Sequence, residues 1–244
     1  MILCLETATS TCSVSINDEG KTLALRECKG QNAHSEKITI FTKEVMDEVG
    51  ISYHQLDAVA VSKGPGSYTG LRIGTSTAKG ICYAADVPMM AVDTLHAMAY
   101  GMRDQLGAEL QSGDLLVPMI DARRMEVYCA VFDSNLNRVK DTAAVVFGTE
   151  NGERRTENAS LSVFRFPFSV SSRLWLFGDG APKLHELFKD ESRVRIIDDF
   201  LPSAAYMATL ADQALKAKDF VDVAYFEPFY LKDFIAGKPH VKGM

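Results

Sequence analysis

Residues 62–80 read SKGPGSYTGLRIGTSTAKG, a stretch dense in glycine that follows the hydrophobic run Leu56–Val61. Glycine and proline clustered after such a run indicate a tight turn in which the backbone approaches something closely. The pattern predicts a strand over Leu56–Val61, a glycine-rich turn, and a helix over Leu71–Ala85. What this strand–turn–helix unit does depends on what its glycines approach.

The turn has some features of a phosphate-binding loop, but its spacing differs from the common nucleotide motifs. A Walker A loop needs Lys and then Ser or Thr after its last glycine, whereas Leu71 follows Gly70. The glycines are also too widely spaced for the dinucleotide motif G-x-G-x-x-G. Backbone N–H groups near Gly66 could still bind an anion at the helix N-terminus. Alternatively, Ser67 and Thr69 could simply cap that helix.

Small residues recur along one face of the predicted helix. Gly70, Gly74 and Ala78 lie at i, i+4 and i+8, with Thr77 and Ile81 alongside. A glycine inside a helix costs about 1 kcal/mol relative to alanine, so close packing should offset it. Such a face allows unusually close approach of another helix. We interpret it as clearance for a helix of this chain or of a partner.

The rest of the chain predicts an α/β protein. Strands are expected over Ile2–Glu6, Thr11–Ile16 and Thr22–Glu27, followed by a helix over Ser35–Val49 with an apolar stripe. Further strands begin at Leu115, after a polar stretch near residues 100–112.

This order predicts two lobes, residues 1–105 and residues 106–244. We expect the helix at 202–218 to pack back toward the first lobe. Residues 148–172 are polar and predict no clear element.

Composition narrows the function classes. A net charge of −6 and a pI near 5.4 argue against a chain that binds nucleic acid alone. No apolar run approaches the roughly 18 residues of a membrane span, and the N-terminus lacks signal-peptide features. We therefore expect a cytoplasmic protein without a membrane segment. The five cysteines form no C-x-x-C pair, which favours buried thiols.

Motifs for hydrolysis or metal binding are missing from the sequence. No two histidines are three or four residues apart, so neither H-x-x-x-H nor H-E-x-x-H occurs. There is no G-x-S-x-G nucleophile elbow, and Cys82 lies in an apolar helix where a thiol should be inert. We predict no catalytic residue and no metal site in this chain.

Two carboxylates end predicted buried strands. Glu6 precedes "TATS", and Asp121 lies in "PMIDARRMEVY". Carboxylates at strand ends could hold Mg²⁺ with a nucleotide. They could equally be caps, or ion-pair partners of Arg123 or Arg124. The residues alone leave both alternatives open.

Several motifs occur in a fixed order: "ILCLETATSTCSVSI", "HSEKI", "KGPGSYTGLRIGTSTAKGI", "PMIDARRMEVYCAVFD", "FGDGA" and "PFYLK". Together they resemble the bacterial TsaB (YeaZ) family, closely over residues 2–132 and loosely beyond. The resemblance implies a two-lobed actin/sugar-kinase/Hsp70-like (ASKHA) fold with mixed sheets flanked by helices. Glu6 stands where that family usually has Asp.

The resemblance also implies a function. A TsaB-like chain would be a non-catalytic subunit of the complex that places threonylcarbamoyl on the adenosine beside the tRNA anticodon. Its expected partners are a TsaD-like catalytic paralogue with the metal-binding H-x-x-x-H motif, and a TsaE-like ATPase. Alone it would form a homodimer, and it would reach tRNA only through the complex. It would require no cofactor itself, whereas ATP or ADP with Mg²⁺ is expected at the level of the complex.

In that family the helices corresponding to Ser35–Val49 and Leu71–Ala85 make the subunit contact. The candidate interface residues are Gly70, Leu71, Gly74, Thr77, Ala78, Ile81, Ile38, Phe41 and Val45. The candidate nucleotide or anion residues are Glu6, Thr9, Gly66, Ser67, Thr69 and Asp121. The alternative function is a stand-alone ASKHA-type ATPase or kinase; the missing histidine pair disfavours a metalloprotease.

Overall fold

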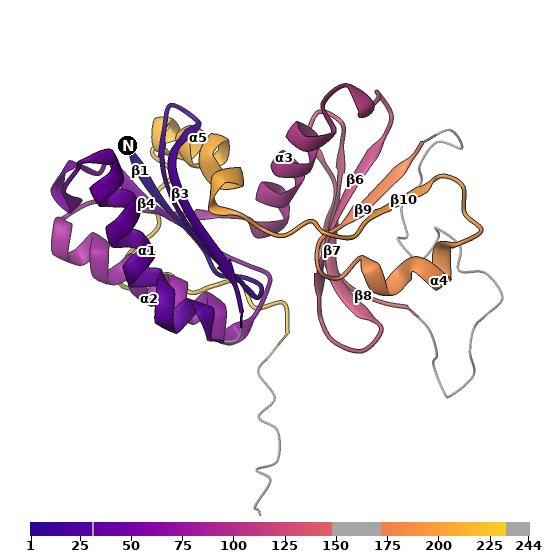
Figure 1. The fold of residues 1–244 in the computed structure, drawn as a ribbon, viewed down its shortest axis with the longest axis horizontal. Helices are drawn as coiled ribbons and strands as arrows, with labels where there is room; N and C mark the ends of the chain where they lie inside the picture. Colours follow the sequence, from indigo (N-terminus) through magenta and orange to yellow (C-terminus); the bar gives the residue numbers. More distant parts are fainter. Residues whose placement is uncertain (31, 148–171, 233–244) are drawn as a thin grey trace, which may run out of the picture.

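The computed structural model describes residues 1–30, 32–147 and 172–232, and it forms two sheets that stand side by side with helices against them (Figure 1). The predicted α/β class with mixed sheets is therefore confirmed. The polar stretch that predicted no element, residues 148–172, lies outside the described residues except for Ser172. In the described part of the chain, no helix has the length and apolar character needed to cross a membrane.

The first sheet has the order β3-β2-β1-β4-β5. Strands β1, β2 and β3 form an antiparallel meander, and β4 and β5 continue the sheet parallel to β1. The bounds are β1 (Ile2–Glu6), β2 (Thr11–Asp18), β3 (Lys21–Lys29), β4 (Ala58–Ser62) and β5 (Met89–Val92). Strands β1 and β4 are buried throughout, and each is an apolar run that ends in one polar residue, Glu6 or Ser62, rather than an alternating sequence.

Helices α1 (Ala33–Val49) and α2 (Tyr68–Ala85) cover one face of this sheet, and α5 (Ala208–Ala217) packs on the opposite face, where Ala211 shares a buried cluster with residues of β1 and β5. Helix α1 ends because Gly50 adopts a left-handed conformation, with φ of 74°. The Gly50 N–H donates to the carbonyls of Met46 and Asp47 in the last turn of the helix. Helix α2 begins at Ser67, whose hydroxyl accepts a hydrogen bond from the Gly70 N–H. The sequence thus contains both the stop of the first helix and the start of the second.

The second sheet has the order β10-β9-β6-β7-β8. Its bounds are β6 (Leu115–Asp121), β7 (Glu126–Asp133), β8 (Arg138–Val146), β9 (Leu174–Phe177) and β10 (Val194–Ile197). Helix α3 (Thr94–Leu106) packs on it through Leu95, Met98 and Met102, which share a buried cluster with Phe132. The structure therefore places α3 against the second sheet, although the predicted boundary assigned its residues to the first lobe.

Short helices complete the described elements. They are η1 (Tyr53–Gln55), η2 (Gly107–Glu109), η4 (Pro182–Leu184), α4 (His185–Phe188) and η5 (Ala204–Met207).

The C-terminal segment, residues 221–232, returns along the first lobe and reaches the second. Val221 forms a bridge with Met89, and the Phe229 N–H donates to the Lys63 carbonyl at 2.7 Å. The ammonium of Lys232 then pairs with Glu126 at the start of β7. This segment therefore connects the first lobe to the turn between β6 and β7.

Candidate functional site

The small-residue face of α2 lies inside the first lobe. A Cβ added at Gly70 would overlap the Thr7 carbonyl oxygen, and one at Gly74 would overlap the Thr7 hydroxyl oxygen. Ala78 is fully buried within the cluster between the first sheet and its helices. The clearance that these residues provide is therefore for the turn after β1 of the same chain.

This burial corrects the predicted interface. Six of its residues lie in the protein's own core: Gly70, Leu71, Gly74, Ala78, Ile38 and Val45. The physical reason is that the apolar stripe of a surface helix faces its own sheet. Phe41, Thr77 and Ile81 are half-buried at the edge of that contact, and their role stays a prediction.

The opposite face of α2 carries a second line of small residues. Ser76, Gly80 and Ala84 lie at i, i+4 and i+8 and are all exposed. A Cβ at Gly80 would meet nothing within 4 Å. Beside this line, the side chain of Tyr83 is 89% exposed. The sequence did not predict this face, because the small residues Gly70, Gly74 and Ala78 have the same spacing and spacing alone does not show which line is exposed.

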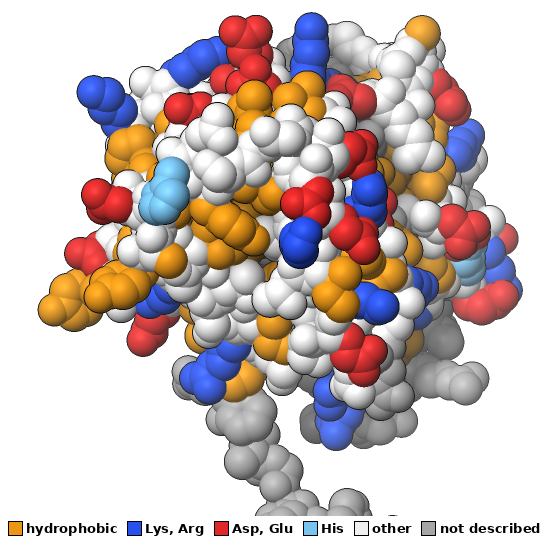
Figure 2. Space-filling view, turned by 60° about the vertical axis from the view of Figure 1, so that its left-hand side comes forward, with side chains coloured by type: hydrophobic (Ala, Val, Ile, Leu, Met, Phe, Trp, Pro, Cys, Tyr) orange, Lys and Arg blue, Asp and Glu red, His pale blue; other side chains and the backbone are white. Residues whose placement is uncertain are grey.

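Helix α1, which packs beside α2, also carries an exposed apolar residue, because the side chain of Ile40 is 46% exposed. We call the exposed residues of both helices, Ile40, Ser76, Gly80, Tyr83 and Ala84, the outer face. Figure 2 turns this side of the first lobe toward the viewer, and hydrophobic groups lie open there among charged ones. Exposed apolar side chains among charged ones occur at protein–protein contact sites.

The turn between β1 and β2 brings together most of the predicted nucleotide residues. Glu6 is buried and accepts the Ala8 N–H at 2.6 Å. The Ser67 N–H donates to the Ala8 carbonyl at 2.6 Å, and Thr9 accepts a hydrogen bond from the Thr11 N–H. Gly66 lies so close to the turn that a Cβ there would overlap the Ala8 carbonyl. These residues hold α2 against β1, whereas Thr69 is exposed.

Two of the backbone N–H groups predicted to bind an anion at the start of α2, those of Ser67 and Gly70, are bonded within the chain. Ser67 N–H is bonded to Ala8, Gly70 N–H to the Ser67 hydroxyl, and Leu71 N–H to the Ser67 carbonyl. The predicted N-cap role of Ser67 is therefore observed, and the anion site stays a prediction.

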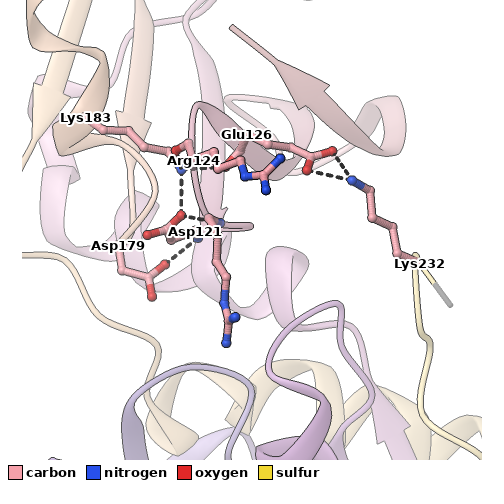
Figure 3. A network of polar contacts seen from close by, with 7 residues as sticks. Asp121, Arg124, Glu126, Asp179, Lys183 and Lys232 are labelled. Atoms are coloured by element: carbon pink, nitrogen blue, oxygen red, sulfur yellow. Dashed lines mark hydrogen bonds and ion pairs between the residues drawn. The ribbon is translucent and has the colours of Figure 1, made fainter. Parts of the chain in front are cut away.

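Asp121 lies apart from that turn, in the second lobe. Figure 3 shows its surroundings: Lys183 Nζ donates to Asp121 Oδ1 at 2.6 Å, and Asp179 Oδ1 accepts the Asp121 N–H at 2.9 Å. The Arg123 backbone N–H also donates to Asp121 Oδ1. Of the two alternatives left open, an ion pair is observed, but with Lys183 rather than with the guanidinium of Arg123 or Arg124.

The carboxylates of Glu6 and Asp121 both take part in contacts within the protein, and their role in binding Mg²⁺ or a nucleotide stays a prediction. Burial raises the pKa of Glu6 to about 7, so this carboxylate carries little charge below neutral pH. The Asp121 carboxylate is neutralised by Lys183. One oxygen of each carboxylate, Glu6 Oε1 and Asp121 Oδ1, is thus engaged in holding the protein's own turns.

The described histidines and cysteines form no cluster suited to a metal ion. Within the described residues, no group of three or more His, Cys, Asp or Glu side chains could hold a metal ion. His96 Nε2 lies 3.2 Å from the Leu136 carbonyl, and its ring stacks on Phe132. Burial raises the pKa of the Cys82 thiol to about 11, so it remains protonated.

Comparison with known proteins identifies the family. A family model described as "TsaD: tRNA N6-adenosine threonylcarbamoyltransferase" matches residues 29–239. The tRNA threonylcarbamoyladenosine biosynthesis protein TsaB of Escherichia coli K12 is 30% identical over 97% of this chain and 96% of its own length. This chain belongs to the TsaB (YeaZ) family.

Another TsaB, from Haemophilus influenzae, is 28% identical over 97% of this chain and 95% of its own length. The structure of YeaZ from Pseudomonas aeruginosa superposes with a TM-score of 0.75, at 24% identity, and covers 94% of this chain and 99% of that one. The fold is therefore the two-lobed ASKHA fold of the TsaB family, as the resemblance implied.

Proposed function

We propose that this chain is a cytoplasmic, non-catalytic subunit in the biosynthesis of threonylcarbamoyladenosine in tRNA. The names of its full-length TsaB relatives support this role. In the proposal, it pairs with a TsaD-like catalytic paralogue, a TsaE-like ATPase docks on the pair, and tRNA is reached through the complex. Its own contribution is a protein surface that holds the catalytic subunit.

The observation that carries the proposal is the outer face. Gly80 leaves open space on the C-terminal half of α2, Tyr83 is exposed on the same helix, and Ile40 is exposed on α1. Small residues allow the backbones of two helices to approach, while exposed aromatic side chains supply contact area. We infer that helices of the paralogue pack on this face, and that two copies of this chain use it when the paralogue is absent.

A bulky side chain at Gly80 tests the pairing. In the isolated chain, the side chain introduced by Gly80→Leu would point into open space. The free energy of unfolding of this variant should therefore equal that of the parent or be slightly higher. It would keep the partner helix at a distance, and we expect pairing with the paralogue to weaken at least about tenfold. Gly30→Leu is a matched control, since a Cβ at Gly30 also meets nothing within 4 Å. Normal pairing of Gly80→Leu in size-exclusion chromatography would contradict the proposed interface.

Reconstitution tests the function itself. This chain is mixed with the TsaD-like and TsaE-like partners, the threonylcarbamoyl donor and tRNA, and each component is omitted in turn. Modified adenosine should form only in the complete mixture. Modification that proceeds equally well without this chain would overturn the proposal.

The proposal assigns no cofactor to this chain, and places any use of ATP or ADP with Mg²⁺ at the level of the complex. The engaged carboxylates of Glu6 and Asp121 support this assignment. Calorimetry with ATP and Mg²⁺ on the isolated chain separates it from the stand-alone ATPase or kinase. Micromolar binding with turnover would favour the enzyme.

A further inference from the structure

The turn between β6 and β7 holds two arginines in an uncommon backbone conformation. Arg123 has φ of 69° and Arg124 has φ of 48°, so both adopt the left-handed region. Residues with a Cβ occupy this region at a cost, and glycine is the usual choice there. Such a conformation persists only where the surroundings enforce it, and it is often found at functional sites.

A network of contacts enforces the conformation of this turn (Figure 3). The Lys183 ammonium donates to Asp121 Oδ1 and to the backbone carbonyls of Arg124, at 3.1 Å, and Glu126. An ammonium has three N–H donors, and all three of those of Lys183 bond this turn. Asp179 fixes the first residue of the turn through the Asp121 N–H. The turn is thus braced from the loop after β9.

The brace extends to the C-terminal segment. Lys232 Nζ lies 2.5 Å from Glu126 Oε1 and 2.6 Å from Glu126 Oε2. The carboxylates of Asp121 and Glu126 are therefore each neutralised by a lysine. Asp179 is a further carboxylate of the network, and it accepts a backbone N–H.

The two guanidinium groups have no hydrogen-bonding, ionic or aromatic partner among the described residues, and both side chains are exposed. Every other arginine among the described residues has such a partner, which is a carboxylate, a backbone carbonyl or an aromatic ring. These arginines are Arg26, Arg72, Arg103, Arg138, Arg173, Arg193 and Arg195. A rigid turn that displays the unpartnered pair is suited to an external anion, because the planar guanidinium binds phosphate in a bidentate manner.

We propose that Arg123 and Arg124 form an anchor for phosphodiester groups of tRNA in the assembled complex. This inference rests on the proposed function. The chain as a whole carries a net charge of −6, so a general basic surface is not the source of RNA contact. Two adjacent arginines on a braced turn give a local contact instead, one that contributes only when the partner supplies the remaining RNA surface. Such contacts fix position rather than read sequence.

The experiment uses the pair formed by this chain and its TsaD-like paralogue, with an unmodified tRNA transcript as the probe. Fluorescence anisotropy gives the dissociation constant at several salt concentrations. The double variant Arg123→Ala/Arg124→Ala should bind tRNA about tenfold more weakly, and the slope of log affinity against log salt should fall by about 1 to 2. Arg123→Lys/Arg124→Lys should retain most of the salt slope, because the charges remain.

Arg103→Ala is the matched control. Its guanidinium is likewise at the surface but pairs with Asp104 on α3, so its removal should change neither affinity nor slope. Size-exclusion chromatography checks that each variant still pairs with the paralogue.

The outcomes separate the two proposals. Failure of the unaltered chain to pair, or of the pair to bind tRNA, would overturn the proposed function and this inference with it. Normal pairing with unchanged affinity and slope in the double variant would overturn the inference alone. Loss of pairing in the double variant would assign the arginines to a protein contact, and calorimetric ATP binding that the variant abolishes would assign them to a mononucleotide. Either result also overturns the inference.

Discussion

The two faces of helix α2 carry the same spacing of small residues and meet different surroundings. On the inner face, Gly70 and Gly74 lie against the turn after β1, and Ala78 is buried. On the outer face, Ser76, Gly80 and Ala84 are exposed, and Gly80 has open space beside it. Small residues at i, i+4 and i+8 therefore indicate a close contact without indicating what makes it.

Substitution by alanine should reveal the difference most strongly at Gly70. The new Cβ would overlap the Thr7 carbonyl oxygen, and because this is a backbone atom, the helix or the β1–β2 turn must shift. We expect Gly70→Ala to lower the free energy of unfolding by about 3 kcal/mol, despite the better helix propensity of alanine. Urea unfolding followed by circular dichroism measures it. A variant as stable as the parent would show that the inner contact is loose.

The pH dependence of stability tests Glu6, which ends β1 just before Thr7, the residue that the inner face of α2 contacts. Burial raises the pKa of Glu6 from 4.5 to about 7 in the folded state. The folded protein then binds more protons than the unfolded chain between these values, so stability falls as pH rises. Between pH 5 and pH 7 the loss from this group amounts to about 2 kcal/mol.

Glu6→Gln should remove this contribution. The free energy of unfolding of the variant should therefore rise relative to that of the parent as pH increases from 5 to 7. Urea midpoints at pH 5, 6 and 7 measure it. A difference that stays constant with pH would mean that Glu6 titrates alike in both states.

The sequence predicts much of the fold because strand and helix signals are local. Strand Ile2–Glu6 has the predicted bounds, since a continuous apolar run ends there at a polar turn. Helix α2 begins three residues earlier than predicted because Ser67, not a later residue, caps it. The place of α3 was not predictable from order along the chain, because its packing against the second sheet depends on contacts distant in sequence.

The site was predicted less well, for the same reason. The sequence signals Glu6, Thr9, Gly66 and Ser67 as special, and the structure brings them together where the β1–β2 turn contacts the turn before α2. Their bonds serve the protein's own packing, which no local pattern reveals. The partner of Asp121 is Lys183, which lies far along the chain. Helical spacing identifies a line on a helix, but only burial shows which line faces the core.

On the outer face, Tyr83 should affect pairing and not stability. Its side chain is 89% exposed, so Tyr83→Ala should leave the free energy of unfolding nearly unchanged. Exposed tyrosines often become central contacts in protein interfaces, and we expect affinity for the paralogue to fall about tenfold. Calorimetric titration of the two subunits measures this change. Leu23→Ala, which alters another exposed apolar residue on strand β3, is the control. Equal losses for both variants would remove the special role of the outer face.

The smallest effect, and the most direct comparison, comes from Gly80→Ala. No atom lies within 4 Å of the added Cβ, so only helix propensity should change. Alanine is better than glycine by about 1 kcal/mol in a helix interior, so this variant should unfold at higher urea concentration than the parent. The same substitution thus has opposite signs at Gly70 and at Gly80, because the first meets a backbone oxygen and the second meets solvent. If Gly80→Ala were destabilising in the isolated chain, α2 would have no free outer face, and the helix would be enclosed on both sides by its own lobe.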